Sequence, residues 1–142
     1  MYKFIYGNEG DDALSGGEGD DVIKGRRGND LIYGKGGNDI LRGSEGNDVL
    51  FGEAGNDVLI GGLGADILVG GYGGDVFVFH TALAGEVEVI VDFEAGTDTV
   101  RLDGRIFTGI NTNGVLAAGA FRAGMAAADA DDRAIGRDVL VG

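Results

Sequence analysis

Eight aspartates follow one another at intervals of nine residues in the first half of the sequence. They are Asp12, Asp21, Asp30, Asp39, Asp48, Asp57, Asp66 and Asp75. Each lies two residues after a glycine and directly before two apolar residues. Carboxylates and main-chain carbonyls are oxygen ligands, and such ligands suit a hard cation, calcium more than magnesium where the geometry is irregular. The spacing therefore predicts a row of cation sites.

The aspartates belong to eight consecutive nonapeptides that fill residues 7–78 without a gap. Glycine occupies positions 1 and 4 of every nonapeptide, aspartate position 6, and apolar residues positions 7 and 8. Each unit is expected to form a glycine-rich turn and a short strand. Such a strand is not stable alone, so we expect two nonapeptides to make one coil and coils to stack at roughly 4.8 Å. Position 8 then fills the interior with Leu14, Ile23, Ile32, Leu41, Leu50, Leu59, Leu68 and Phe77.

Stacked turns place carboxylates of like charge at ~5 Å, where their repulsion is substantial even at moderate dielectric. A cation between them removes that repulsion. Glycine permits turn conformations that aim main-chain carbonyls inward. Calcium held between turns therefore explains why glycine and aspartate recur together.

The composition is strongly acidic and rich in glycine. The 142 residues include 30 Gly, 24 acidic and 11 basic side chains, and the formal net charge is −13. This balance argues against nucleic acid as a partner, since phosphate binding needs clusters of Lys and Arg. The sequence has no Cys, which excludes disulfides and thiolate metal sites. No cleaved secretory signal is visible at residues 1–10, and no apolar stretch is long enough to predict a membrane span.

Residues 79–142 lose the nine-residue period and are expected to form a β cap with its boundary near residue 79. Residues 76–80, 87–93 and 98–102 are predicted strands, and residues 116–133 an Ala-rich loop or short helix.

Position 9 turns apolar in the last four repeats, at Phe51, Ile60, Val69 and Val78. We expect residues 79–142 to fold back over this outer face, or a partner chain to cover it. Ordinary β-propensity is the other explanation.

Residues 7–78 resemble an RTX (repeats-in-toxin, haemolysin-type) calcium-binding β-roll. Residues 89–102 (VIVDFEAGTDTVRL) and 126–133 (AAADADDR) resemble the segment that follows the roll in serralysin-type secreted proteases. The resemblance implies an all-β fold, a right-handed parallel β-roll capped by a C-terminal β segment. It also implies calcium ions between turn i and turn i+2, held by both aspartates and by loop carbonyls.

Carried over to this chain, the resemblance implies six complete sites. The aspartate pairs are 12 with 30, 30 with 48, 48 with 66, 21 with 39, 39 with 57, and 57 with 75. The candidate carbonyl ligands belong to Gly7, Gly16, Gly25, Gly34, Gly43, Gly52, Gly61 and Gly70. About six divalent ions nearly cancel the formal charge of −13.

The repeats also depart from the family pattern. Position 2 carries a side chain in five repeats, and position 5 changes from Asp or Asn to Ala65 and Gly74 in the last two. Loss of a turn-stabilising side chain is expected to weaken the sites at that end. Asp92 and Asp98 are further ligand candidates, or simply a strand-end and a turn aspartate.

Catalytic interpretations fit poorly, and we expect no enzyme activity. His80 is the only histidine, which excludes the HExxH zinc site of a serralysin protease. The serines, Ser15 and Ser44, both lie in repeats, far from His80 in sequence. Asp11 and Asp12 imitate a glycosidase pair, but repetition every nine residues favours ion binding. No nucleotide-binding motif follows a predicted strand.

The resemblance implies a secreted bacterial module that folds on calcium binding outside the cell and stabilises, or aids type I secretion of, an attached protein. The alternative is the C-terminal fragment of an extracellular protease or polysaccharide-modifying enzyme whose catalytic domain lies upstream. Residues 136–142 (GRDVLVG) resemble both a C-terminal secretion signal and a degenerate repeat, and both interpretations stay open. An ice-binding solenoid is disfavoured, because position 3 shows no regular ladder.

Overall fold

The structure, a computed structural model, describes residues 2–80, 88–102, 115–116, 125–126 and 139–141. In that part of the chain, all regular elements are strands, and they form two seven-stranded sheets. In hydrogen-bonding order, sheet A contains β1 (Phe4–Tyr6), β3 (Val22–Arg27), β5 (Ile40–Glu45), β7 (Val58–Leu63), β9 (Val76–Phe79), β11 (Thr99–Leu102) and β12 (Val115–Leu116). Sheet B contains β2 (Ala13–Gly17), β4 (Leu31–Gly36), β6 (Val49–Ala54), β8 (Ile67–Tyr72), β10 (Glu88–Ile90), β14 (Val139–Val141) and β13 (Met125–Ala126).

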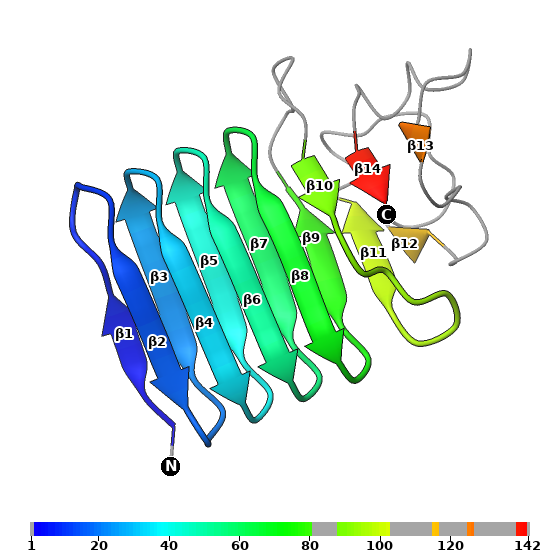
Figure 1. The fold of residues 1–142 in the computed structure, drawn as a ribbon, viewed down its shortest axis with the longest axis horizontal. Helices are drawn as coiled ribbons and strands as arrows, with labels where there is room; N and C mark the ends of the chain where they lie inside the picture. The colour runs from blue at the N-terminus through cyan, green and yellow to red at the C-terminus, as the bar shows by residue number, and fades with distance from the viewer. Residues whose placement is uncertain (1, 81–87, 103–114, 117–124, 127–138, 142) are drawn as a thin grey trace.

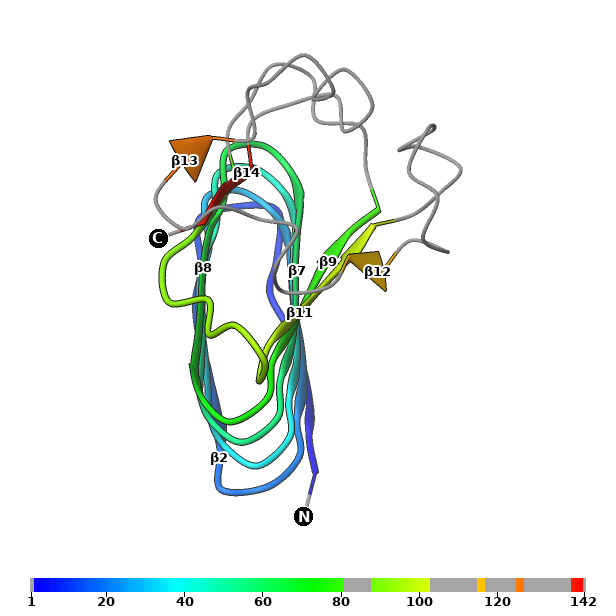
Figure 2. The ribbon, with the colours of Figure 1, turned by 90° about the vertical axis from the view of Figure 1, so that its right-hand side faces the viewer.

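The chain winds alternately through the two sheets as a parallel β-solenoid (Figure 1). Ile23 in β3 pairs with Leu41 in β5, and Ile32 in β4 pairs with Leu50 in β6. This offset of 18 residues equals two nonapeptides, so the prediction of two nonapeptides per coil is confirmed. Figure 2 shows the flattened cross-section, in which the sheets face each other and the turns lie at the two narrow edges.

The core lies between the two sheets, and each repeat contributes one inward-facing apolar side chain to it, at position 8. From Ile23 to Phe77, every side chain at position 8 is 0% exposed, as predicted. Leu14 is only partly buried because β2 is an edge strand. Each fully buried apolar side chain of this size contributes about 1.5–3 kcal/mol. The core is small, so the stability of the fold also depends on the interactions made at the turns.

The turns of the third to eighth repeats share a left-handed conformation. Position 4 is glycine with positive φ in all six, from Gly28 (φ 110°) to Gly73 (φ 121°). Position 2 also has positive φ, and its residue is not glycine in four turns: Arg26, Lys35, Ser44 and Glu53. A side-chain-bearing residue in this region costs about 1–2 kcal/mol. The contacts between stacked turns must offset that strain.

The solenoid pairing continues beyond the eighth repeat. All three predicted strands are present as β9, β10 and β11, each shorter than its predicted range. Strand β10 pairs parallel with β8, and β11 pairs parallel with β9. Their apolar residues, including Ile90 and Val100, extend the core at 0% exposure. The division of the chain at residue 79 stays a prediction.

The described residues near the C-terminus also form strands. Strand β14 pairs parallel with β10, whereas β12 and β13 pair antiparallel with β11 and β14. Leu116, Met125 and Ala126 lie in strands, so the loop or short helix predicted for residues 116–133 is wrong at these positions. The other residues of that range lie outside the described part of the chain.

The apolar outer face at position 9 is partly buried. Tyr33 and Phe51 stack along sheet B with ring centroids 5.0 Å apart and planes 8° apart. Strands β10 and β11 add to the sheet edges and not to this face (Figure 1). Most of residues 79–142 lie outside the described part, so the predicted cover remains untested.

Candidate metal centre

The position-6 aspartates form two columns along the narrow edges of the solenoid (Figure 2). The upper column, on the upper edge in Figure 1, precedes strands of sheet B and contains Asp12, Asp30, Asp48 and Asp66. The lower column precedes strands of sheet A and contains Asp21, Asp39, Asp57 and Asp75. From Asp21 onward, each of these aspartates is at most 2% exposed.

One oxygen of each carboxylate joins successive coils. The Oδ1 atom of Asp30 accepts a hydrogen bond from the backbone N–H of Asp12 at 2.8 Å, and Asp48 bonds to Asp30 in the same way. All six predicted aspartate pairs are linked by such a bond, at 2.7 to 2.9 Å. The structure therefore brings together every aspartate pair that the resemblance implies.

The other carboxylate oxygen is left without a partner in several coils. The Oδ2 atoms of Asp30, Asp39, Asp48, Asp57 and Asp75 are buried and accept no hydrogen bond. A buried polar atom without a partner costs about 1–3 kcal/mol, and more when it is charged. Repeated in both columns, this pattern indicates that a cation is the missing partner.

The position-1 glycines form the wall of the space that these oxygens face. A Cβ atom on Gly7 would lie 2.5 Å from Oδ2 of Asp12 and 2.5 Å from the carbonyl oxygen of Gly25 in the next coil. All eight position-1 glycines border Oδ2 of their own repeat's aspartate. In five spaces the second oxygen is a position-1 carbonyl, that of Gly25, Gly34, Gly43, Gly52 or Gly70. A carboxylate and a carbonyl thus converge where only glycine fits.

The electrostatics of both columns disfavour ionised carboxylates in the absence of a cation. Burial, reinforced by the neighbouring aspartates, raises the pKa of Asp48 and of Asp57 to about 7, although backbone hydrogen bonds act in the opposite direction. The pKa values of Asp30, Asp39 and Asp75 are raised for the same main reason, burial. At neutral pH the columns need positive charge to hold their carboxylates ionised.

A family model for the RTX calcium-binding nonapeptide repeat matches residues 6–41, 33–68 and 42–77. Together these matches cover residues 6–77, just over half of the chain. The chain belongs to this RTX family. A search of curated proteins found no match. The matched family model describes a calcium-binding repeat module.

The oxygens of the RTX turns suit calcium. Among the residues that the structure describes, no group of three or more His, Cys, Asp or Glu side chains is placed to hold a metal. Two carboxylates per gap therefore need main-chain carbonyls to complete a coordination shell of six to eight oxygens. The converging glycine carbonyls supply such oxygens. The fit is to calcium rather than zinc, because neither cysteine nor a histidine cluster is present.

Position 5 of the RTX repeat stabilises the turns. The side-chain Oδ1 of Asn29 accepts a hydrogen bond from the backbone N–H of Asn47 one coil later, at 2.8 Å, and Asn38 bonds to Asn56 likewise. The ladder ends at the backbone N–H groups of Ala65 and Gly74, which are the last donors. These two residues have no side-chain acceptor to offer to the following coil.

The first two RTX turns differ from the others. Oδ2 of Asp12 accepts the backbone N–H of Asn8 at 2.6 Å, and Oδ2 of Asp21 accepts that of Gly17 at 2.7 Å. Neither Asn8 nor Gly17 has the positive φ of the later turns. The oxygens that the later turns leave for a cation are here bonded within the turn.

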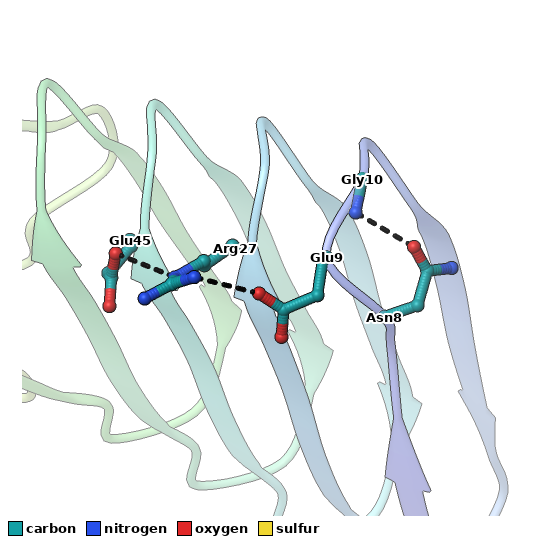
Figure 3. A network of polar contacts seen from close by, with 5 residues as sticks. All are labelled: Asn8, Glu9, Gly10, Arg27 and Glu45. Carbon is teal, nitrogen blue, oxygen red and sulfur yellow. Dashed lines mark hydrogen bonds and ion pairs between the residues drawn. The ribbon is translucent and has the colours of Figure 1, made fainter.

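Exposed side chains add weak links outside the columns. Figure 3 shows Arg27 bridging Glu9 and Glu45 across three coils, at 3.2 and 3.1 Å, and the side chain of Asn8 accepting the N–H of Gly10. The paired side chains of Arg27, Glu9 and Glu45 are more than half exposed, so each pair contributes at most about 1 kcal/mol.

Asp98 and Asp92, the two further candidates, have different surroundings. Oδ1 of Asp98 accepts the N–H of Asp75 at 2.9 Å, which is the ladder bond of the lower column. Residues 93–101 (FEAGTDTVR) thus repeat the turn of residues 52–60 (GEAGNDVLI), with Phe93 at position 1. Asp92 instead accepts the N–H groups of Gly70 and Gly71. It caps the start of the last regular turn, residues 70–75.

Glu88 is the site residue that the sequence prediction missed. Val89 pairs with Ile67, so Glu88 lies beside Asp66 at position 6 of the next coil of the upper column. It is 1% exposed, and burial, together with Asp66, raises its pKa to about 9. The nine-residue period is interrupted before Glu88, so its spacing from Asp75 does not identify it as a position-6 residue. The available signal was an acidic residue followed by Val89, Ile90 and Val91, as at positions 6 to 9 of a repeat.

No helix in the described ranges is long and apolar enough to cross a membrane.

Proposed function

We propose that this chain is a calcium-binding RTX module that folds when calcium binds outside the cell, and that it stabilises an attached protein or aids its type I secretion. The observation that carries the proposal is the repeated pairing of a buried, unpartnered Oδ2 with a glycine carbonyl of the next coil. Calcium bound there would join adjacent coils and neutralise the columns.

The physical basis is an equilibrium between the unfolded and folded chain that calcium binding shifts toward the folded state. Two carboxylates ~5 Å apart repel by about 3 kcal/mol at an effective dielectric of about 20. Thirty glycines add a large conformational entropy to the unfolded chain, and each repeat from the second to the eighth contributes one fully buried apolar side chain to the core. Where free calcium is scarce, the repeats would stay unfolded. Where it is abundant, the binding free energy becomes folding free energy.

The proposed ligands are the position-6 aspartates and the position-1 glycine carbonyls, which would hold about six ions. Residues with positive φ at positions 2 and 4 keep the turns in the conformation that aims these oxygens inward. The first two turns would have to release Oδ2 of Asp12 and Asp21 from their local N–H groups to bind fully.

A role in secretion rests on the family and on the conditional folding. RTX repeats are typical of secreted bacterial proteins, and an unfolded chain suits passage through a type I channel. An upstream catalytic domain, of a protease or a polysaccharide-modifying enzyme, is one possible attached protein. The likeness of residues 89–102 to a serralysin-type cap supports the same setting.

Far-UV circular dichroism during a calcium titration tests the proposal. We expect a coil-like spectrum in chelator, a transition to β structure with calcium, and no transition with magnesium at the same concentrations. A chain that is already rich in β structure in strong chelator would contradict conditional folding.

Two variants that remove one negative charge each provide the control. Asp48→Asn removes a ligand that faces two gaps, whereas Glu9→Gln removes an exposed charge at the outer surface. We expect Asp48→Asn to raise the calcium concentration at the midpoint several-fold and Glu9→Gln to leave it nearly unchanged. Equal shifts would mean that overall charge, and not ion binding in the columns, controls folding.

A further inference from the structure

The upper column does not end at the last repeat aspartate. In the regular coils, the backbone N–H at position 7 donates to the carbonyl at position 6 of the preceding coil, as Ile67 does to Asp48 at 2.8 Å. Val89 donates to the carbonyl of Asp66 in the same way, also at 2.8 Å. Glu88 is therefore built into the column as its fifth carboxylate, after a connection that is longer than in the repeats.

The Glu88 side chain lies where a main-chain carbonyl lies elsewhere. A Cβ atom on Gly61 would meet Oδ2 of Asp66 and, at 2.5 Å, Oε1 of Glu88. In the corresponding space at Gly52, the second oxygen is the carbonyl of Gly70, also at 2.5 Å. One carboxylate oxygen thus replaces the carbonyl that a further glycine turn would have supplied.

The second oxygen of Glu88 indicates that a ligand is missing. Oε2 is buried and has no hydrogen-bond partner, and the whole residue is 1% exposed. Among the described residues, the ion pairs are those of Arg27 at the far end of the roll, so no lysine or arginine there neutralises Glu88. A buried carboxylate needs a proton, a cationic side chain or a metal ion.

We infer that Glu88 and Asp66 hold a further calcium ion between β8 and β10, with the Glu88 carboxylate in place of a glycine carbonyl. The inference rests on the proposed calcium-binding function of the repeats. A carboxylate brings more negative charge than a carbonyl, which favours a divalent cation. The ion would link β10, the first strand after the repeats, to β8 of the solenoid. Calcium binding would then order β10 together with the repeats.

Calcium counting on the full chain tests this site. Equilibrium dialysis with radioactive calcium at neutral pH should show one ion fewer in Glu88→Gln than in the native protein. Glu94→Gln, which makes the same charge change at an exposed residue of the next turn, should bind the native number. An unchanged count in Glu88→Gln would overturn the site. A native chain that binds no calcium would instead contradict the proposed function.

Two further measurements apply if Glu88→Gln folds poorly. Hydrogen exchange separates the cases, because loss of this site should expose the Val89 amide in calcium while the Val49 amide, bonded to Asp30, stays protected. Infrared spectroscopy of the calcium-loaded native protein requires no variant. A calcium-bound Glu88 gives no protonated-carboxyl band, whereas a proton shared with Asp66 gives one and would overturn the inference.

Discussion

At the scale of single residues, the two carboxylate oxygens of the position-6 aspartates from Asp30 to Asp75 have separate tasks. Oδ1 accepts the N–H of the preceding coil and fixes the register, while Oδ2 faces the glycine-walled space. The first task does not need calcium and the second does. A change of aspartate should therefore affect both the stacking of coils and the number of bound ions.

We expect the position of an aspartate in its column to determine how many ions it holds. Asp48 lies between two gaps of the upper column, whereas Asp12 borders one. We expect Asp48→Ala to lose two calcium ions and Asp12→Ala to lose one, measured by equilibrium dialysis. Equal losses from the two variants would contradict pairing between turn i and turn i+2.

Sequence periodicity predicted the repeat aspartates and glycines as candidate ligands because each nonapeptide carries the same residue types at the same positions. It did not predict Glu88, because the chain from Phe79 to Glu88 is longer than the corresponding part of a repeat. Glu88 therefore does not fall at the nine-residue spacing that identifies position 6. Asp98 kept its spacing from Gly96, but Phe93 replaces the diagnostic glycine. Asp98 was a ligand candidate from the sequence, but the pairing of β11 with β9 assigns it to position 6, and Glu88 became identifiable only when β10 was placed beside β8.

At the scale of the elements, the turns and the strands are stabilised by different means. The strands bury position 8, and the turns are joined by side-chain ladders at positions 5 and 6. Arg26 and Lys35 keep a left-handed backbone that is unfavourable for them alone, which shows how strongly the stacked turns determine local conformation.

The position-5 ladder should contribute to stability independently of calcium. Asn56 accepts the N–H of Gly74 at 2.7 Å, so Asn56→Ala should lower the free energy of unfolding in saturating calcium by about 0.5–1.5 kcal/mol. Asn56→Asp keeps the acceptor, as Asp11 does for Asn29 at 2.8 Å, and should retain most of the stability. Chemical denaturation measures both. Equal losses would show that the carboxamide acts through something other than this bond.

Among the described C-terminal strands, β14 continues the parallel pairing of the solenoid, whereas β12 and β13 pair antiparallel. Strand β14 pairs parallel with β10 through Val139 and Val141, in the manner of a further coil. This backbone pairing favours the interpretation of residues 136–142 as a degenerate repeat. A C-terminal secretion signal is compatible with the same residues, since export precedes folding in the proposed mechanism.

At the scale of the whole molecule, the charge on the columns links folding to both calcium and protons. The repeats carry their position-6 aspartates in two columns, and position 6 is aspartate in all eight repeats. Anything that neutralises the columns should favour the folded state. Calcium is the ion that we propose neutralises the carboxylates outside the cell. Protons can also neutralise them, and lowering the pH tests this in the absence of calcium.

The calcium-free chain should become more stable as the pH is lowered. The pKa of Asp48 and of Asp57 is about 7 in the folded state, against an ordinary value of 3.8, and that of Glu88 is about 9 against 4.5. The folded chain therefore binds more protons than the unfolded chain between about pH 4 and pH 9. Its stability must fall as the pH rises through this window.

Calcium should reverse this dependence, because the ion requires ionised carboxylates and competes with protons for them. Circular dichroism from pH 4 to pH 9, in chelator and in saturating calcium, measures both cases. In chelator, β structure should be greatest near pH 4 and decline toward pH 9, with most of the stability from Asp48 and Asp57 lost between their ordinary pKa of 3.8 and their folded-state pKa of about 7. In calcium, β structure should be retained at neutral pH, and the bound calcium should be released on acidification. A calcium-free chain that gains structure as the pH rises would show that the buried carboxylates are stabilised by contacts within the protein, and the columns would then not need a cation.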